Sequence, residues 1–251
     1  MWEWLRQIAR TIRRKGAIMP QHAELLPRYK HLRQVVFQLN NTLLPTISKD
    51  VMAEGGKICR HVHLPLQSAS DRILAAMKRT YTVDAYREVV RRLRAAAPGI
   101  AITTDVIVGF PGETTEDFER TAEFLDEMRY DGAFLFKYSA RPDTRAWHWQ
   151  ETVSEAEKGE RLTRLIEQQH RISGEIHDGW VGREVEVLVE GRARKDSSQL
   201  FGKSEEFKTV VFEDDGTPAG ALRRVRVAGA TPVTLIGVTR PAESPALVQI
   251  R

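Results

Sequence analysis

Glycines and a carboxylate cluster directly after a predicted buried strand in the middle of the chain. Residues 100–108 are rich in β-branched side chains, which is the composition of a buried strand, and Gly109 ends that pattern. In α/β folds, the loops that follow the carboxyl ends of strands build the ligand sites. Residues 109–113 therefore mark a candidate ligand rim. The alternative is an ordinary tight turn between a strand and a helix, because short loops of this kind are common.

Local signals predict the elements around this rim. Pro111 and Gly112 predict a turn, and Thr114 is suited to cap a helix that begins at Thr115. Asp117 lies three residues after Thr114, which is the spacing of a capping box. Together with the preceding strand, this stretch predicts one strand–turn–helix unit.

Another strand is predicted over residues 58–66, with Pro65 near its carboxyl end and Ser70 suited to cap the next helix. His61 and His63 project to one side of this strand. A metal pair is one interpretation, and structural histidines with satisfied ring nitrogens are the other. We favour the structural interpretation, because the sequence shows no evident third ligand.

Strands and helices alternate through residues 58–139. Thr82 is suited to cap a strong helix, and residues 133–139 form a further strand, after which residues 140–144 again place polar side chains at a carboxyl end. This alternation predicts a parallel sheet with helical crossovers. Three such units are too few to close a barrel, so we expect an open or partial sheet. A short strand is possible at residues 35–37.

The pattern changes after these strands. Ser154 and Glu157 have the spacing of another capping box, and residues 151–178 predict a helix that connects two domains. Over residues 179–240 the apolar period is two, which predicts a small all-β barrel followed by a tail at residues 241–251. Its predicted strands lie at residues 185–189, 210–212, 225–227 and 235–236. The expected fold class is therefore α/β plus all-β.

The predicted barrel carries basic side chains suited to contact RNA phosphates, because small barrels of this sort often bind oligonucleotides on one face. The candidates are Arg192, Arg194, Lys195, Lys203, Lys208, Arg223, Arg224 and Arg226, with Phe201 or Phe207 available for stacking on bases. Acidic residues nearly cancel the basic ones across residues 179–240, so composition leaves RNA binding open.

Composition bounds the class of protein. With 41% hydrophobic and 29% charged residues, the 251-residue chain is typical of a soluble globular protein. No apolar run approaches the ~18 residues of a membrane span, and the start lacks a signal peptide's apolar block, so we expect a cytoplasmic protein. Residues 1–34 hold eight basic and two acidic residues, and residues 1–15 predict a basic amphipathic helix. Cys59, the only cysteine, excludes an internal disulfide and a cysteine-held iron–sulfur site within this chain.

Several motifs occur in the order found in one family. They are His63–Ser68, Met77–Thr82, Thr104–Thr114, Phe136–Ser139 with Arg141 and Pro142, Val181–Gly191, Leu200–Lys203 and Leu235–Gly237. The first four resemble the radical-SAM methylthiotransferases that act on tRNA, and the last three are similar to the TRAM domain that closes such enzymes. The resemblance covers roughly residues 32–240. It implies the C-terminal half of a radical-SAM (β/α) barrel over residues 32–150 and a TRAM-type barrel over residues 179–240.

This resemblance implies a chemistry and a set of site residues. Such enzymes add a methylthio group to carbon 2 of isopentenyl-adenosine next to the tRNA anticodon, using S-adenosylmethionine and [4Fe-4S] clusters. The implied partner is tRNA, through its anticodon stem-loop. By position, Gln67 and Ser68 end one strand near the cofactor, while Asp105, Gly109 and Glu113 belong to the central rim. These five residues are the cofactor-facing candidates, and packing roles stay open for Asp105 and Gly109.

The chain also departs from the family pattern. The family's three N-terminal cysteines and its CxxxCxxC motif are absent, Ala69 replaces a usual glycine, and Asp143 stands where glycine is usual. Residues 1–31 form a divergent basic segment. We therefore expect the C-terminal part of a methylthiotransferase that is catalytically incompetent alone, and we assign it no catalytic residue and no metal ligand. The alternatives are a non-catalytic RNA-binding module or a subunit completed by a complementary N-terminal chain.

Overall fold

The computed structural model describes residues 35–36, 59–142 and 144–239, with the side chains of residues 35, 36 and 145 left out. The chain forms two compact units, Met1–Leu32 and Arg33–Arg251. The first unit, and with it the helix predicted for residues 1–15, lies outside the described residues. The tail at residues 241–251 also lies outside them.

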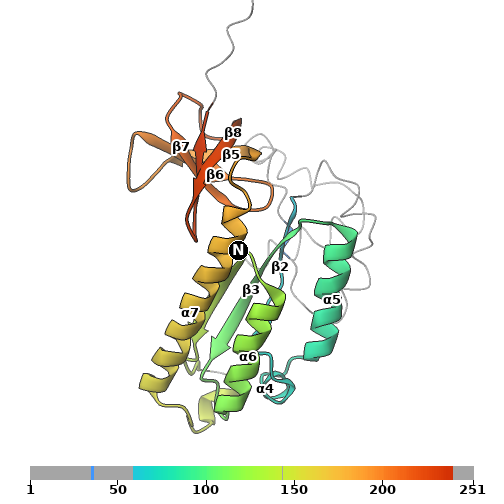
Figure 1. The fold of residues 1–251 in the computed structure, drawn as a ribbon. Helices are drawn as coiled ribbons and strands as arrows, with labels where there is room; N and C mark the ends of the chain where they lie inside the picture. Colours follow the sequence, from blue (N-terminus) through green and yellow to red (C-terminus); the bar gives the residue numbers. More distant parts are fainter. Residues whose placement is uncertain (1–34, 37–58, 143, 240–251) are drawn as a thin grey trace, which may run out of the picture. The chain divides into compact units, whose positions relative to one another are not determined.

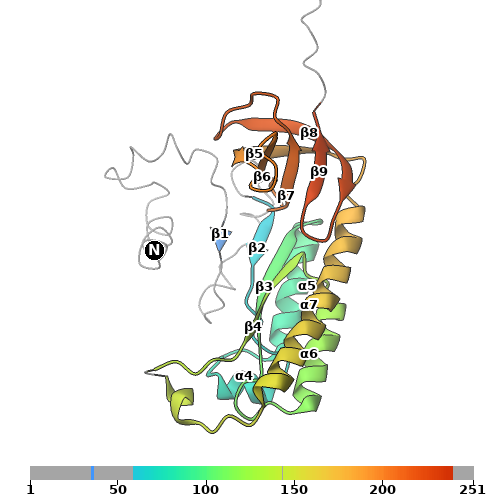
Figure 2. The same ribbon diagram turned by 90° about the vertical axis from the view of Figure 1, so that its left-hand side faces the viewer.

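Four strands form a parallel sheet in the order β1-β2-β3-β4 (Figures 1 and 2). They are β1 (Val35–Val36), β2 (His61–His63), β3 (Ala101–Val108) and β4 (Gly132–Lys137). The predicted parallel arrangement is confirmed. β2 is shorter than the predicted strand because Pro65 has no N–H to continue the ladder. Pairing with β3 resumes at Gln67, which forms a bridge with Val106.

The connecting helices begin at the predicted capping residues. They are α4 (Asp71–Ala76), α5 (Val83–Ala96) and α6 (Thr115–Met128). Ser70, Thr82 and Thr114 each accept a hydrogen bond from a backbone N–H three residues on, and Asp117 completes the capping box of α6. In the part of the chain that the structure describes, no helix combines the length and apolarity needed to cross a membrane.

One face of the sheet is covered by α5, α6 and α7 (Glu155–Asp178), as Figure 2 shows. Alternate residues of β3, such as Ile102 and Val106, are fully buried there, in one apolar core with Leu125 of α6 and Leu165 of α7. This burial of apolar area supplies the main free energy that holds the helices on the sheet.

The opposite face of the sheet carries polar and aromatic side chains, and we call it the inner face. Thr103, Asp105 and Ile107 of β3 point to it, because they alternate with the buried residues. Phe134 lies beside Asp105 in the sheet register, and Phe136 lies beside Ile107. These two aromatic side chains are 53% and 50% exposed. The inner face is thus an open surface within the described residues.

α7 packs along the sheet with a face that is partly polar. Ser154 accepts the predicted hydrogen bond from the backbone N–H of Glu157. The reciprocal bond of a capping box is not formed, and the Glu157 carboxylate pairs with Arg161. Arg161 is buried, whereas Ile166 and His170 face solvent.

Five further strands form a closed barrel in the order β5-β6-β7-β9-β8. They are β5 (Glu184–Arg192), β6 (Gln199–Lys203), β7 (Thr209–Glu213), β8 (Leu222–Ala230) and β9 (Leu235–Val238). The third and fifth of these strands, β7 and β9, run parallel, and the other neighbours run antiparallel. This is the topology of an OB-fold. The prediction of a small closed β-barrel is confirmed.

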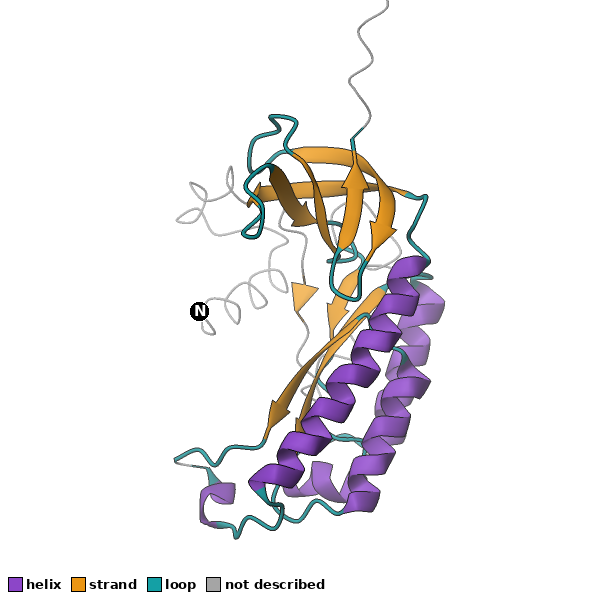
Figure 3. Ribbon diagram, turned by 60° about the vertical axis from the view of Figure 1, so that its left-hand side comes forward, coloured by secondary structure: helices purple, strands orange, loops and turns teal. Residues whose placement is uncertain are grey.

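The barrel contacts the α/β layer through the turn between β6 and β7. The Lys208 ammonium lies 2.6 Å from the carboxylate of Asp131, which directly precedes β4. Phe207 stacks on His61 at the start of β2, with ring centroids 4.7 Å apart. The barrel turn therefore contacts the amino-terminal ends of β2 and β4, and Figure 3 shows α7 leading into the barrel.

Candidate functional site

The turn after β3 has a fixed backbone. The N–H of Glu113 donates to the carbonyl of Phe110 across 2.8 Å, with Pro111 and Gly112 between them. Gly112 has φ +86°, as the third position of a type II turn requires. Gly109 has φ +74°, and a Cβ built there would lie 2.4 Å from Cγ of the Lys158 side chain. Gly109 is therefore required both by its backbone conformation and by the packing of α7.

Glu113, a predicted cofactor-facing residue, turns into the protein. Its carboxylate Oε2 accepts a hydrogen bond from the Gly109 N–H at 2.6 Å and pairs with the Arg161 guanidinium at 2.6 Å. The Glu113 side chain is 1% exposed and that of Arg161 is 6% exposed. Burial raises the pKa of Glu113, against the opposing effect of these two partners. In this structure the carboxylate fixes the turn from inside the protein.

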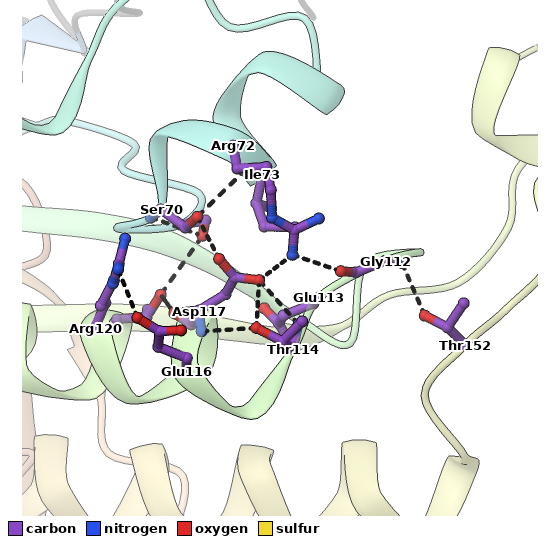
Figure 4. Close-up of polar contacts among 12 residues, drawn as sticks. Ser70, Arg72, Ile73, Gly112, Glu113, Thr114, Glu116, Asp117, Arg120 and Thr152 are labelled. Atoms are coloured by element: carbon purple, nitrogen blue, oxygen red, sulfur yellow. Dashed lines mark hydrogen bonds and ion pairs between the residues drawn. The ribbon is translucent and has the colours of Figure 1, made fainter.

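Asp117 organises the space between this turn and α4 (Figure 4). Its Oδ1 accepts a hydrogen bond from the Ser70 hydroxyl at 2.6 Å. Its Oδ2 accepts from the backbone N–H and hydroxyl of Thr114, and it also pairs with Arg72. Burial alone would raise the pKa of Asp117, but these donors outweigh it and lower the pKa to about 2. The carboxylate thus joins two helix starts that lie on neighbouring βα units.

The turn is also held from its outer side (Figure 4). The Gly112 carbonyl accepts a hydrogen bond from Arg72 at 2.7 Å, and the Gly112 N–H donates to the Thr152 hydroxyl at 2.8 Å. Phe110 packs edge-on against Tyr138 and Trp149, with centroid distances of 5.1 and 5.8 Å. Tyr138, Trp149 and Thr152 therefore stabilise the turn.

Gln67 has the properties of a ligand-facing residue. Its φ is +72°, a conformation that is uncommon for a side chain larger than glycine and that the surrounding structure must hold in place. The residue is 6% exposed. Its backbone is paired with β3, yet its side-chain amide makes no hydrogen bond to any described residue. A nearly buried amide without a partner is suited to bind a polar ligand.

Ser68, the neighbouring candidate, makes its polar contacts inside the protein. It is fully buried, its hydroxyl lies 3.5 Å from that of Thr121, and it accepts a hydrogen bond from the Ser70 N–H. The side chain thus contacts α6 and the start of α4.

Asp105 reaches the inner face beside a histidine. Its Oδ2 lies 3.3 Å from Nε2 of His63, and the two side chains are 28% and 17% exposed. Nδ1 of His63 lies 3.0 Å from the Thr103 hydroxyl, which is also 2.8 Å from Nε2 of His61. Both histidines therefore have side-chain partners on the sheet. The sequence analysis identified Asp105, but it did not identify Thr103 as the residue that links the two histidines.

The residues present do not fit an iron–sulfur cluster. The chain has one cysteine, whereas a [4Fe-4S] cluster needs a set of thiolate ligands. Among the described residues, no group of three or more His, Cys, Asp or Glu side chains is placed to hold a metal ion. Among the predicted cofactor-facing residues, Gln67 offers an unpaired amide and Asp105 an accessible carboxylate for a polar ligand.

The predicted RNA contacts on the barrel fall into different environments. Arg194 and Lys195, in the loop between β5 and β6, are exposed, and no described acidic side chain pairs with them. Arg192 is exposed but lies 2.5 Å from Asp214, and Arg224 is exposed with Glu186 4.0 Å away.

Two residues predicted to contact RNA lie where the barrel meets the α/β layer. Lys208 is 4% exposed and paired with Asp131, so the prediction that this ammonium contacts RNA at the surface is wrong. Phe207 is stacked on His61 and is not free for a base. Lys203 lies over the Phe207 ring, 4.4 Å from its centroid, and burial lowers the pKa of Lys203.

The outer faces of the barrel differ in charge. On β5 and β8, outward Glu184 lies opposite Arg226, and Glu186 lies opposite Arg224, so charges alternate and balance. On β6 and β7, the outward side chains are Gln199, Phe201, Lys203, Thr209, Val211 and Glu213. We call this second surface the β6–β7 face. It carries an aromatic ring and a cation, and its one acid lies at the end of β7.

Comparison with known proteins gives the family. Residues 6–125 match the family model of the radical SAM superfamily, so the match includes part of the segment set apart as divergent. The tRNA-2-methylthio-N(6)-dimethylallyladenosine synthase of Myxococcus xanthus (strain DK1622) is 51% identical over 185 residues, 72% of this chain and 40% of that protein. The same-named proteins of Alkaliphilus oremlandii (strain OhILAs) and Porphyromonas gingivalis (strain ATCC BAA-308 / W83) are each 44% identical over 188 residues. These alignments cover 75% and 74% of this chain, and 40% and 41% of those proteins.

A solved structure shows a weaker similarity. Coproporphyrinogen III oxidase (HemN) from Escherichia coli, described as a radical SAM enzyme, aligns with a TM-score of 0.44 at 19% identity. The alignment covers 56% of this chain and 32% of that chain, a level that adds no argument about the fold. The chain spans about two fifths of the length of the curated relatives it matches. With the radical SAM match over residues 6–125 and this level of identity to those relatives, the chain belongs to the radical-SAM tRNA methylthiotransferase family.

Proposed function

We propose that this chain is the part of a tRNA methylthiotransferase that binds tRNA and faces S-adenosylmethionine. The reaction is addition of a methylthio group to carbon 2 of isopentenyl-adenosine next to the anticodon, which agrees with the names of the relatives. The observation that carries the RNA-binding part is the OB-type barrel with its nearly acid-free β6–β7 face. We propose that this barrel is a TRAM-type domain in a cytoplasmic enzyme.

The barrel supports RNA binding through its topology. OB-folds bind oligonucleotides on the outer face of their second and third strands, together with the loop between the first and second strands. Here those strands are β6 and β7, and that loop carries Arg194 and Lys195. Phe201 is the aromatic side chain of the β6–β7 face, and aromatic rings in this position stack on bases.

Hydrogen–deuterium exchange in the presence and absence of tRNA tests this surface. We expect tRNA to slow exchange in residues 193–203 and 209–213, because bound RNA covers the β6–β7 face and the adjoining loop. Exchange on the outer side of β5 and β8 is the internal control, since charges balance there. Protection confined to β5 and β8, or no protection anywhere, would contradict the proposed surface.

The sheet supports a contact with S-adenosylmethionine at the inner face and at the carboxyl end of β2. Gln67 and Asp105 are the residues that would hold it, since one has an unpaired amide and the other an open carboxylate. When bound beside an iron–sulfur cluster, S-adenosylmethionine supplies the radical and the methyl group for this class of reaction. The cluster itself must be held by other residues, because this chain has one cysteine.

We therefore propose that the chain is catalytically incompetent alone, and that cluster ligands from outside this sequence, in further residues or in a complementary chain, are needed for activity. Anaerobic reconstitution with iron and sulfide tests this. We expect no stoichiometric iron–sulfur cluster and no cleavage of S-adenosylmethionine by the chain. A stoichiometric cluster with cleavage would overturn the proposal.

A non-catalytic RNA-binding module is the second candidate, and the single cysteine favours it. The intact mass of the native protein from its source cells separates the two candidates. A mass well above 28.6 kDa would favour the enzyme, whose further residues then supply the cluster ligands. A mass of 28.6 kDa would favour the RNA-binding module or a two-chain enzyme.

A further inference from the structure

A chain of polar side chains crosses the inner face from β2 to β3. It consists of His61, Thr103, His63 and Asp105. The Thr103 hydroxyl is hydrogen-bonded to both histidine rings, at 2.8 and 3.0 Å, and Nε2 of His63 lies 3.3 Å from Oδ2 of Asp105. His63 and Thr103 are direct neighbours in the parallel register of β2 and β3. The sheet backbone therefore fixes the order of the four side chains.

The Thr103 hydroxyl can donate its proton to Nδ1 of His63, and the neutral ring of His63 then carries its proton on Nε2. In the other neutral tautomer of His63, an unprotonated Nε2 would direct its lone pair at the Asp105 carboxylate 3.3 Å away, which is repulsive. The Asp105 carboxylate therefore favours the first tautomer.

This tautomer places Nε2–H of His63 beside Oδ2 of Asp105. The other carboxylate oxygen, Oδ1, makes no hydrogen bond to a described residue, and the side chain is 28% exposed. Phe134 lies next to Asp105 in the sheet and edge-on to His63, with ring centroids 5.8 Å apart. The Phe134 ring is half exposed on the same face. An oriented acceptor beside an exposed aromatic ring suits a flat ligand that carries an N–H or O–H donor.

We infer that His63 is a positioning residue that holds Asp105 so that Oδ1 accepts a hydrogen bond from a nucleoside ligand on the inner face. Thr103 acts one step further away, because its hydroxyl fixes the ring of His63. This inference rests on the proposed function for the nature of the ligand. The distances among Thr103, His63 and Asp105 do not depend on the nature of the ligand.

Nitrogen NMR of the intact chain with ¹⁵N-labelled histidine tests the arrangement without any ligand. We expect Nε2 of His63 to carry a proton at neutral pH. In Asp105→Asn we expect both neutral tautomers of His63 to be populated, because the carboxylate no longer selects Nε2–H. His170, which is exposed on α7, is the internal control, and its signals should not change. An unprotonated Nε2 in the wild-type chain would overturn the inference.

Binding of S-adenosylhomocysteine, measured by calorimetry, tests the role of the pair. We expect Asp105→Asn to lower the affinity about tenfold or more, because a charge-assisted hydrogen bond is lost. His63→Phe should lower it several-fold, and His63→Gln should restore it, since the glutamine amide N–H replaces Nε2–H. The matched control, His170→Phe, should leave the affinity unchanged. Wild-type affinity in Asp105→Asn would overturn this inference alone, whereas no binding to the wild-type chain would overturn the proposed S-adenosylmethionine face as well.

Discussion

At the scale of single residues, the polar groups at the carboxyl end of β3 are held mainly by one another. Asp117 accepts hydrogen bonds from Ser70 and Thr114, and Glu113 is paired with Arg161. A carboxylate taken out of water keeps its charge only when such donors replace the lost hydration. The residues left open to a ligand are those whose polar atoms lack internal partners, above all Gln67.

The low pKa of Asp117 makes an acid-stability prediction. The folded-state pKa is about 2 and the unfolded value is 3.8, so the carboxylate contributes about 2 kcal/mol above pH 4. That contribution is lost as the pH falls through the folded-state pKa. Asp117→Asn should remove most of it, measured as the free energy of unfolding in urea at pH 7 and pH 3. If the variant and the wild type lose the same free energy of unfolding between pH 7 and pH 3, this account is contradicted. Asp126→Asn, on the exposed side of α6, is the control.

Sequence patterns identified several of these side chains but not their partners. The capping signal of Thr114 and Asp117 is local, so the spacing of three residues was sufficient to predict it. Arg161 lies 48 residues from Glu113, and no local pattern connects the two. The same holds for the β2–β3 register that brings Thr103 beside His63, because register depends on the packing of the whole sheet.

At the scale of elements, caps and apolar periods predicted the βα units, and local exceptions explain the differences. No strand is predicted from the sequence for β6, because only Leu200 and Phe201 of its five residues are apolar and Gly202 follows them. In the structure, Gly202 is needed there, since a Cβ would lie 2.1 Å from the Leu188 carbonyl oxygen. The pattern of apolar residues also could not predict the polar buried face of α7, because its charged side chains are buried as ion pairs.

The turn after β3 predicts opposite effects for two glycine substitutions. Gly109→Ala should destabilise the chain by at least about 1 kcal/mol, since φ is +74° and the new Cβ meets Lys158. Gly159→Ala, in the same region of α7, should stabilise it by about 0.5–1 kcal/mol, because nothing lies within 4 Å and alanine favours helix. Thermal unfolding of both variants is the measurement. Equal effects of the two substitutions would contradict the described turn.

At the scale of the whole described unit, the barrel and the sheet share a buried ion pair. Lys208 and Asp131 have side chains 4% and 16% exposed, and Asp131 also accepts a hydrogen bond from the N–H of Ile102. The barrel is therefore tied to the first residues of β3 and β4. His177 of α7 adds a second contact, with Nδ1 2.7 Å from the Thr231 carbonyl oxygen.

Breaking this pair on one side should be costly. Lys208→Met leaves the Asp131 charge without its partner and should lower the free energy of unfolding by about 3 kcal/mol. Asp131→Asn should have a similar effect, and in the double variant the losses should not add, because both changes remove one interaction. Denaturant unfolding of the four proteins gives the coupling energy. Additive losses would show that the contact between Lys208 and Asp131 does not join the two parts.

The salt dependence of tRNA binding tests the central claim, that the barrel binds RNA, most directly. Phosphate contacts release counterions, so the logarithm of the affinity should fall linearly with the logarithm of the salt concentration. The double variant Arg194→Ala/Lys195→Ala should weaken binding and reduce that slope by about 1–2. The matched control Arg91→Ala/Arg92→Ala, on the exposed side of α5, should leave both unchanged. An affinity for tRNA that does not change with salt would contradict RNA binding through the barrel. So would a slope that changes in the α5 variant but not in the barrel variant.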